Sequence, residues 1–84
     1  MYSTDSIQLL LFGWAREALG AQQIDIDNMH GKTVGDLKKH LDTLSELNGR
    51  LQECMIAINH RYAPDDAILL ANDEIALIPP VSGG

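Results

Sequence analysis

The fold of this chain is decided by the stretch Thr33-Val34-Gly35-Asp36-Leu37-Lys38-Lys39-His40-Leu41-Asp42-Thr43-Leu44. Its apolar residues recur with the three- and four-residue spacing that puts side chains on one face of an α-helix; they are Val34, Leu37, Leu41 and Leu44. The spacing predicts an amphipathic helix over about residues 33–47. Such a helix must bury its leucine face against another layer of structure.

Both ends of this helix carry recognisable signals. Thr33 is a good N-cap, and Asp36 three residues later completes an approximate capping box and suits the positive end of the helix dipole. Asn48-Gly49 is the predicted end, because both residues tolerate the left-handed conformation that closes helices.

The layer beneath the helix is predicted from alternating apolar residues, which indicate β-strands. The predicted strands are residues 7–12, 23–27, 54–59 and 74–78. Period-two alternation assigns these side chains to the core: Ile7, Leu9, Leu11, Ile24, Ile26, Ile56, Ile58, Ile75 and Leu77. It assigns these to the outer face: Gln8, Leu10, Phe12, Ala76 and Ile78.

The connections between these strands are predicted from residues that end a strand or favour a turn. Gly13 ends the first strand, residues 14–19 fit a short helix, and Gly20 is placed to close it. Residues 59–60 are predicted to form a turn, since Asn tolerates positive φ. Residues 62–70 contain another turn signal, followed by a short apolar run.

The resulting order is β, short α, β, α, β, β, which predicts an α+β roll over a single domain, residues 1–84. In such a roll a mixed sheet of four to five strands packs on one main helix, and the last strand lies beside the first. Ala76 and Ile78 would then lie next to Leu10 and Phe12, making an exposed apolar patch. Patches of this kind on small domains mark partner surfaces. Arg16 is the basic residue expected to flank it.

The last strand runs into residues 79–84, which are predicted to form an extended arm. Pro79 and Pro80 fix φ and keep the preceding residues extended. Val81 offers one apolar anchor and Ser82 is small and polar. Gly83 and Gly84 have no side chain, so they can enter a channel too narrow for other residues.

The Gly84 carboxylate is therefore the predicted reactive group. A carboxylate must be activated, for instance as an acyl-adenylate, before sulfide, a thiolate or an amine can attack it. The sequence contains no Walker motif or dinucleotide fingerprint. We therefore expect no cofactor on this chain, ATP to be used by an activating enzyme in trans, and no catalytic side chain here.

Composition narrows the remaining classes of function. A net charge of −6 over 84 residues argues against nucleic-acid binding, which needs a basic face. The longest apolar run is too short to cross a membrane, and no basic signal-peptide region is present. With one cysteine, Cys54, the simplest expectation is a cytoplasmic protein with a reduced thiol. The spacing of His30, His40 and His60 predicts no metal site.

The chain resembles the small subunits of molybdopterin synthase, the MoaD-type sulfur carriers with a ubiquitin-like β-grasp fold. The matching stretches are Leu10-Leu11-Phe12-Gly13-Trp14-Ala15-Arg16-Glu17-Ala18-Leu19-Gly20, Thr33-Val34-Gly35-Asp36-Leu37, Ala57-Ile58-Asn59 and Asp73 to Gly84. The ending Pro-Pro-Val-Ser-Gly-Gly is the most specific of these.

The resemblance implies that Gly84 is adenylated by a ubiquitin-activating-like enzyme and converted to a thiocarboxylate. The sulfur would then go to cyclic pyranopterin monophosphate, with the arm in the active site of the large synthase subunit. Family members are usually heterotetramers of two small and two large subunits. Phe12 and Ile78 match family positions that contact partners. The arm residues Pro79, Pro80, Val81, Ser82 and Gly83 would enter the large subunit.

Two other functions use the same tail. A ubiquitin-like protein modifier would join Gly84 to lysine amines through an isopeptide bond. A sulfur carrier of the thiamine pathway shares the fold and the Gly-Gly ending but resembles this chain less before it. The sequence favours the molybdopterin carrier through Pro79-Pro80-Val81-Ser82.

Overall fold

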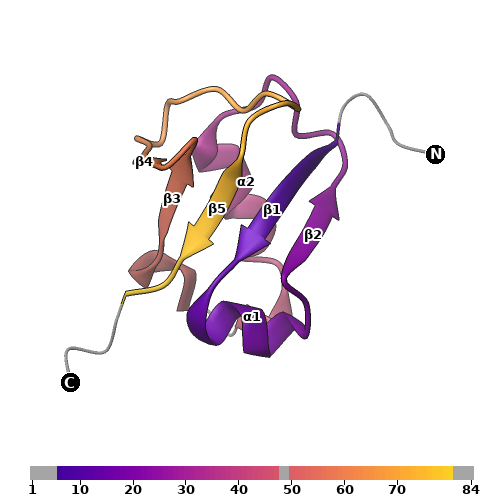
Figure 1. Ribbon diagram of the computed structural model, residues 1–84, viewed down its shortest axis with the longest axis vertical. Coiled ribbons are helices and arrows are strands. Elements are labelled where there is room, and N and C mark those ends of the chain that lie inside the picture. Colours follow the sequence, from indigo (N-terminus) through magenta and orange to yellow (C-terminus); the bar gives the residue numbers. More distant parts are fainter. Residues whose placement is uncertain (1–5, 48–49, 81–84) are drawn as a thin grey trace.

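The computed structural model describes residues 6–47 and 50–80 of the chain. The elements follow one another as β1 (Ile7–Leu11), α1 (Gly13–Leu19), β2 (Gln23–Ile26), α2 (Val34–Leu41), the short 3-10 helices η1 (Ser45–Leu47) and η2 (Arg50–Glu53), β3 (Met55–Ile58), β4 (Arg61–Tyr62) and β5 (Ile75–Ile78). The strands form one sheet in the order β2-β1-β5-β3-β4 (Figure 1). The predicted α+β roll is confirmed, with five strands.

The sheet is mixed, as predicted, because the last strand lies beside the first. β1 pairs antiparallel with β2, with Leu9 opposite Ile24, and parallel with β5, with Leu10 opposite Ala76. β3 pairs antiparallel with β5, with Met55 opposite Ile78. The two central strands, β1 and β5, therefore end side by side.

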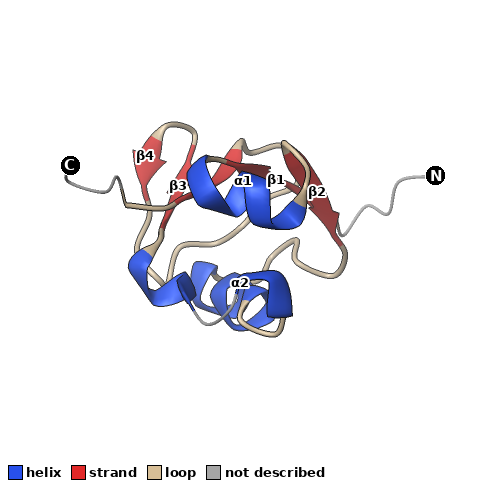
Figure 2. Cartoon of the chain, turned by 90° about the horizontal axis from the view of Figure 1, so that it is seen from below, coloured by secondary structure: helices blue, strands red, loops and turns tan. Residues whose placement is uncertain are grey.

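Helix α2 lies across one face of the sheet, while the opposite face carries no described helix (Figure 2). α1 lies at the end of the sheet where β1 stops (Figure 1). The core between α2 and the sheet contains the residues predicted to point inward. Those that are buried are Ile7, Leu9, Leu11, Ile26, Val34, Leu37, Leu41, Ile56, Ile75 and Leu77; Ile24 and Ile58 are partly buried against them.

The predicted capping box begins α2. The Thr33 hydroxyl accepts a hydrogen bond from the Asp36 backbone N–H at 3.1 Å, and the Asp36 carboxylate accepts one from the Thr33 N–H at 3.1 Å. The backbone and hydroxyl hydrogen bonds of Thr33 lower the pKa of Asp36, because they favour the charged carboxylate. The sequence signal and the local structure agree here.

The predicted extent of this helix was wrong, because α2 ends at Leu41 and not near Leu47. The Thr43 hydroxyl and N–H both donate to the His40 carbonyl, at 2.6 and 3.1 Å. In a continuing helix the Leu44 N–H would use that carbonyl. It donates instead to Leu41 at 3.0 Å, so the chain continues in tighter turns. The predicted stop at Asn48-Gly49 lies outside the described residues.

The segment after β3 also differs from expectation. Asn59 and His60 make the predicted turn, with φ of 52° and 72°. This two-residue turn returns the chain as β4, so that Tyr62 lies opposite Ala57. Residue 62, which was expected to start a turn region, is therefore part of the sheet. No helix within residues 6–47 and 50–80 is long and apolar enough to cross a membrane.

Candidate functional site

The face of the sheet that α2 leaves uncovered carries the polar side chains of Gln8 and Gln23 at one edge and an apolar surface beside them. One row of paired residues crosses four strands, from Leu10 on β1 through Ala76 and Ala57 to Tyr62 on β4. Beside it, Ile78 is paired with Met55, and Phe12 follows directly after β1. We call these seven residues the outer face.

The outer face has large exposed side chains around a flat centre. Phe12, Met55 and Tyr62 are 48%, 47% and 66% exposed. Ala76 points outward as predicted but is only 8% exposed. Its single methyl lies between neighbouring strands that carry Leu10 and Ala57, so it forms part of the floor. The predicted patch of Leu10, Phe12, Ala76 and Ile78 is thus present, and it extends onto β3 and β4.

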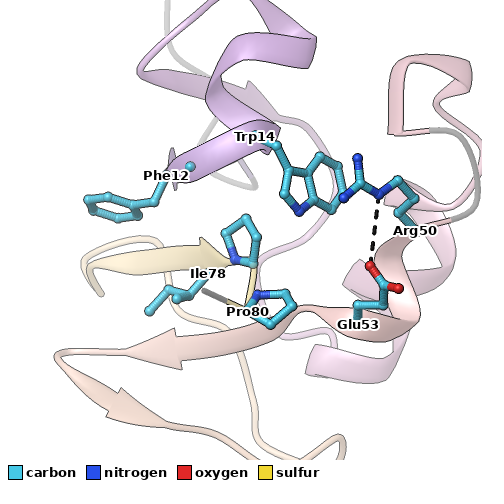
Figure 3. A pocket seen from close by; sticks show the side chains of 8 residues that line it. Phe12, Trp14, Arg50, Glu53, Ile78 and Pro80 are labelled. Atoms are coloured by element: carbon cyan, nitrogen blue, oxygen red, sulfur yellow. Dashed lines mark ion pairs between the residues drawn. The ribbon is translucent and has the colours of Figure 1, made fainter. Parts of the chain in front are cut away.

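An open hollow continues the outer face where β1 and β5 end. It is lined by Phe12, Gly13, Trp14, Arg50, Glu53, Ile78, Pro79 and Pro80. Figure 3 shows Phe12 and Trp14 on one side, Ile78 and Pro80 on another, and Arg50 and Glu53 on η2. The root of the C-terminal arm therefore leaves the body through a mainly apolar surface.

The polar groups of this hollow gather around Trp14. The Arg50 guanidinium lies over the indole, 4.0 Å from the ring centroid, in a cation–π contact. The Arg50 Nε atom is 3.8 Å from a Glu53 carboxylate oxygen (Figure 3). The indole N–H is buried and has no hydrogen-bond partner among the described residues. Arg50 and Trp14 thus form one wall of the hollow.

The predicted site residues divide into three groups. Phe12, Ile78, Pro79 and Pro80 meet in the hollow, with Pro79 buried and Pro80 exposed. Arg16 is exposed on α1 but does not line the hollow, so its role as a partner contact stays a prediction. Val81, Ser82, Gly83 and Gly84 lie outside the described residues.

The other reactive side chains that the structure describes are not assembled into a site. Cys54 is buried, and burial raises the pKa of its thiol, which keeps it protonated. The imidazole of His60 lies 3.0 Å from Glu74 on the exposed surface. No three His, Cys, Asp or Glu residues within 6–47 and 50–80 come together as metal ligands.

Several residues of this surface were not predicted from the sequence. Met55 could have been found by extending the alternation of Ile56 and Ile58 back by one residue. Tyr62 could have been found by treating Asn59-His60 as a two-residue hairpin turn, which fixes the register that follows. Arg50 and Glu53 carry no periodic signal, and only the tertiary fold brings them to Trp14.

Comparison with known proteins agrees with this architecture. Residues 9–84 match the ThiS family. The molybdopterin synthase sulfur carrier subunit of Arabidopsis thaliana is 38% identical over 98% of this chain and 86% of its own length.

Two solved structures extend the comparison. SAMP1 from Haloferax volcanii has a TM-score of 0.78 at 30% identity, covering 94% of this chain and 99% of that one. A chain from the complex of subunits 1 and 2 of molybdopterin-converting factor from Helicobacter pylori has a TM-score of 0.68 at 25% identity, covering 94% and 99%. Because the fold and the family match agree, this chain belongs to the ThiS family of ubiquitin-like β-grasp proteins and is a relative of the molybdopterin synthase sulfur carrier subunits.

Proposed function

We propose that this chain is the sulfur-carrier subunit of a molybdopterin synthase. The observation that carries the proposal is the outer face, which is apolar, is covered by no helix of the described residues, and is continuous with the hollow at the root of the arm. A surface of this kind fits a protein partner that binds the body and receives the arm. The large synthase subunit is that partner in the proposal, because a relative was solved as a complex of subunits 1 and 2.

In this proposal the reacting group is the Gly84 carboxylate. Its oxygen attacks the α-phosphorus of ATP in a ubiquitin-activating-like enzyme, which releases pyrophosphate and leaves an acyl-adenylate. Sulfide then attacks the acyl carbon and displaces AMP, which leaves a thiocarboxylate. The sulfur passes to cyclic pyranopterin monophosphate in the large subunit, and water restores the carboxylate.

The body of this chain supplies docking and presentation, with no catalytic side chain and no bound cofactor. Phe12 and Ile78 contact the partner at the hollow, Arg16 contacts it from α1, and residues 79–83 carry the terminus into the large subunit. The assembly is a cytoplasmic heterotetramer of two small and two large subunits. The exposed Phe12 and the partly exposed Ile78 support this division of work, because both are accessible without unfolding the core.

A second function is favoured by one comparison. SAMP1 is a small archaeal modifier protein, and its fold matches this chain closely. A modifier would use the same Gly84 acyl-adenylate but pass it to a lysine amine, forming an isopeptide bond. A thiamine-pathway carrier stays a third possibility because the matching family is ThiS.

Intact mass spectrometry of the chain purified from its own cells tests the proposal. We expect a population in which one terminal oxygen is replaced by sulfur, and we expect removal of Gly84 to abolish it while the fold stays intact. Branched conjugates on lysines of other proteins would show that the chain is a modifier. Deleting the gene should stop molybdopterin synthesis, and a thiamine requirement in its place would support the third function.

A further inference from the structure

We propose that Gly13 is a positioning residue that fixes the direction in which the C-terminal arm leaves the body, acting through Pro79. This inference rests on the proposed function, since it concerns how the arm is presented to partners. It assigns a role to the junction between β1 and α1, which does not itself belong to the arm.

The contact follows from the parallel pairing of the two central strands. Leu11 is opposite Leu77, so Gly13 and Pro79 each lie two residues beyond the same pair. A Cβ atom built on Gly13 would lie 3.4, 3.8 and 3.9 Å from three carbons of the Pro79 ring. Pro79 is buried, whereas the next residue, Pro80, is exposed. The first proline of the arm is thus seated on a residue without a side chain.

Gly13 is suited to this seat for two separate reasons. Its φ is +56°, in the left-handed region that favours glycine. In addition, the Cβ atom of any side chain at residue 13 would touch the Pro79 ring at van der Waals distance, and we expect the further carbons of a branched side chain to press against that ring. The first reason concerns the local fold, and the second concerns the arm.

The same helix contains a natural control for the first reason. Gly20 closes α1 with a φ of +68°, and nothing lies within 4 Å of a Cβ atom built on it. A side chain at Gly20 therefore meets the same kind of backbone strain without touching the arm. Substituting both glycines alike separates strain from positioning.

The contact between Gly13 and the Pro79 ring matters because two prolines make the start of the arm stiff. Proline fixes φ, so the orientation of the Pro79 ring is passed on to Pro80 and the residues that follow. A docked body delivers the Gly84 carboxylate productively only if the arm points into the partner's active site. Misplacement of a reacting group by about 1 Å can cost about 100-fold in rate.

The test compares Gly13→Val with Gly20→Val in the complete chain. Sulfur transfer is measured with the large subunit and thiocarboxylated protein, with kcat and KM determined separately. We expect Gly13→Val to lower kcat by about 10- to 100-fold while KM stays within about twofold, because the seven residues of the outer face are unchanged. Gly20→Val should keep the wild-type kcat despite a similar loss of stability.

A second readout does not depend on activity. Nuclear Overhauser contacts between the protons of residue 13 and the Pro79 ring should be present in the wild type and in Gly20→Val. In Gly13→Val the contacts between the Pro79 ring and the residues around it should change, because the ring is displaced from its wild-type position. Should Gly13→Val not fold, Pro79→Ala removes the ring from the other side of the contact and should give the same fall in kcat.

The outcomes distinguish this inference from the proposed function. A wild-type kcat in Gly13→Val and in Pro79→Ala, or an equal loss of kcat in Gly20→Val, would overturn the positioning role. Absence of sulfur transfer by the wild type would refute the proposed function and the inference built on it. In that case the nuclear Overhauser contacts would still report whether Pro79 is seated on Gly13.

Discussion

Asn59 joins the turn after β3 to the start of β5. Its side-chain amide donates to the Asp73 carboxylate at 3.0 Å, and its side-chain carbonyl accepts from the Glu74 backbone N–H at 2.9 Å. Its own backbone N–H donates to the Glu74 carbonyl at 2.8 Å. Its φ of 52° also places it in the left-handed region. One residue therefore sets both the turn and the point where the last strand begins.

Two substitutions should separate these contributions. Asn59→Gly keeps the left-handed conformation and loses both side-chain hydrogen bonds, for an expected loss of about 1 kcal/mol in the free energy of unfolding. Asn59→Ala should lose about 1 kcal/mol more, because it adds backbone strain. Urea unfolding of both variants measures the difference. Equal stabilities would show that the positive φ carries no cost here.

The residue type was enough to predict some of this and not the rest. Asn59 and Gly20 were expected in turns because each tolerates positive φ, and both have it. The hydrogen bonds of Asn59 with Asp73 and Glu74 join residues about fifteen positions apart. No local pattern encodes a contact over that separation, since it arises only when β3 and β5 pair.

At the scale of elements, α2 is stabilised by its N-terminal capping box. The pKa of Asp36 is lowered in the folded chain, so its contribution is present above the unfolded pKa and is lost as pH falls through the folded pKa. Stability should therefore decline below about pH 4, and Asp36→Asn should remove this component of the decline. Asp27→Asn, at an exposed site outside the helix, serves as the control. Unfolding by urea across this pH range measures the effect, and identical pH profiles for the wild type and Asp36→Asn would contradict it.

The start of α2 was predictable and its end was not. A capping box is a local signal, read from residues three apart. At the end, the hydroxyl and the backbone N–H of Thr43 both donate to the His40 carbonyl, and the Leu44 N–H donates to the Leu41 carbonyl, which no local sequence signal indicates. The apolar spacing continues to Leu44, and this residue still packs against the core from the turn that follows. Periodicity alone therefore overstated the length of the helix.

Strand β5 allows a direct test of the two faces of the sheet. Ile78 is partly buried on the outer face, whereas Ile75 is fully buried against the core. Ile78→Asp should weaken binding of the large subunit by about 2 kcal/mol or more, typical of a buried interface residue, with little change in stability. Ile75→Asp should unfold the chain, because it buries an unpaired charge.

The two measurements are binding by calorimetry and unfolding by urea. Loss of the fold in Ile78→Asp would show that its side chain supports the core. If Ile78→Asp folds and binds the large subunit as tightly as the wild type, the hollow is not part of the interface.

At the scale of the whole molecule, α2 buries one face of the sheet, and the other face, apolar over most of its area, is covered by no described helix. The sequence predicted this arrangement on β1 and β5, where period-two alternation puts Phe12 and Ile78 outward. It did not predict the extension to Tyr62, because β4 exists only through its pairing with β3. Nor did it predict the contact between Arg50 and Trp14. This contact joins α1 and η2, which precede and follow α2 in the sequence. Local patterns predicted four of the five strands and the two faces of β1 and β5, and tertiary packing completed the surface.

The central claim is that the main-chain terminus at Gly84 carries the sulfur and that the folded body binds the partner that receives it. The most direct test mixes the thiocarboxylated chain with the large subunit and cyclic pyranopterin monophosphate and follows the intact mass of the chain. We expect the terminal sulfur to be replaced by oxygen only when both are present, as molybdopterin forms. Sulfur that stays on the chain under these conditions, or passes to the substrate without the large subunit, would contradict the account.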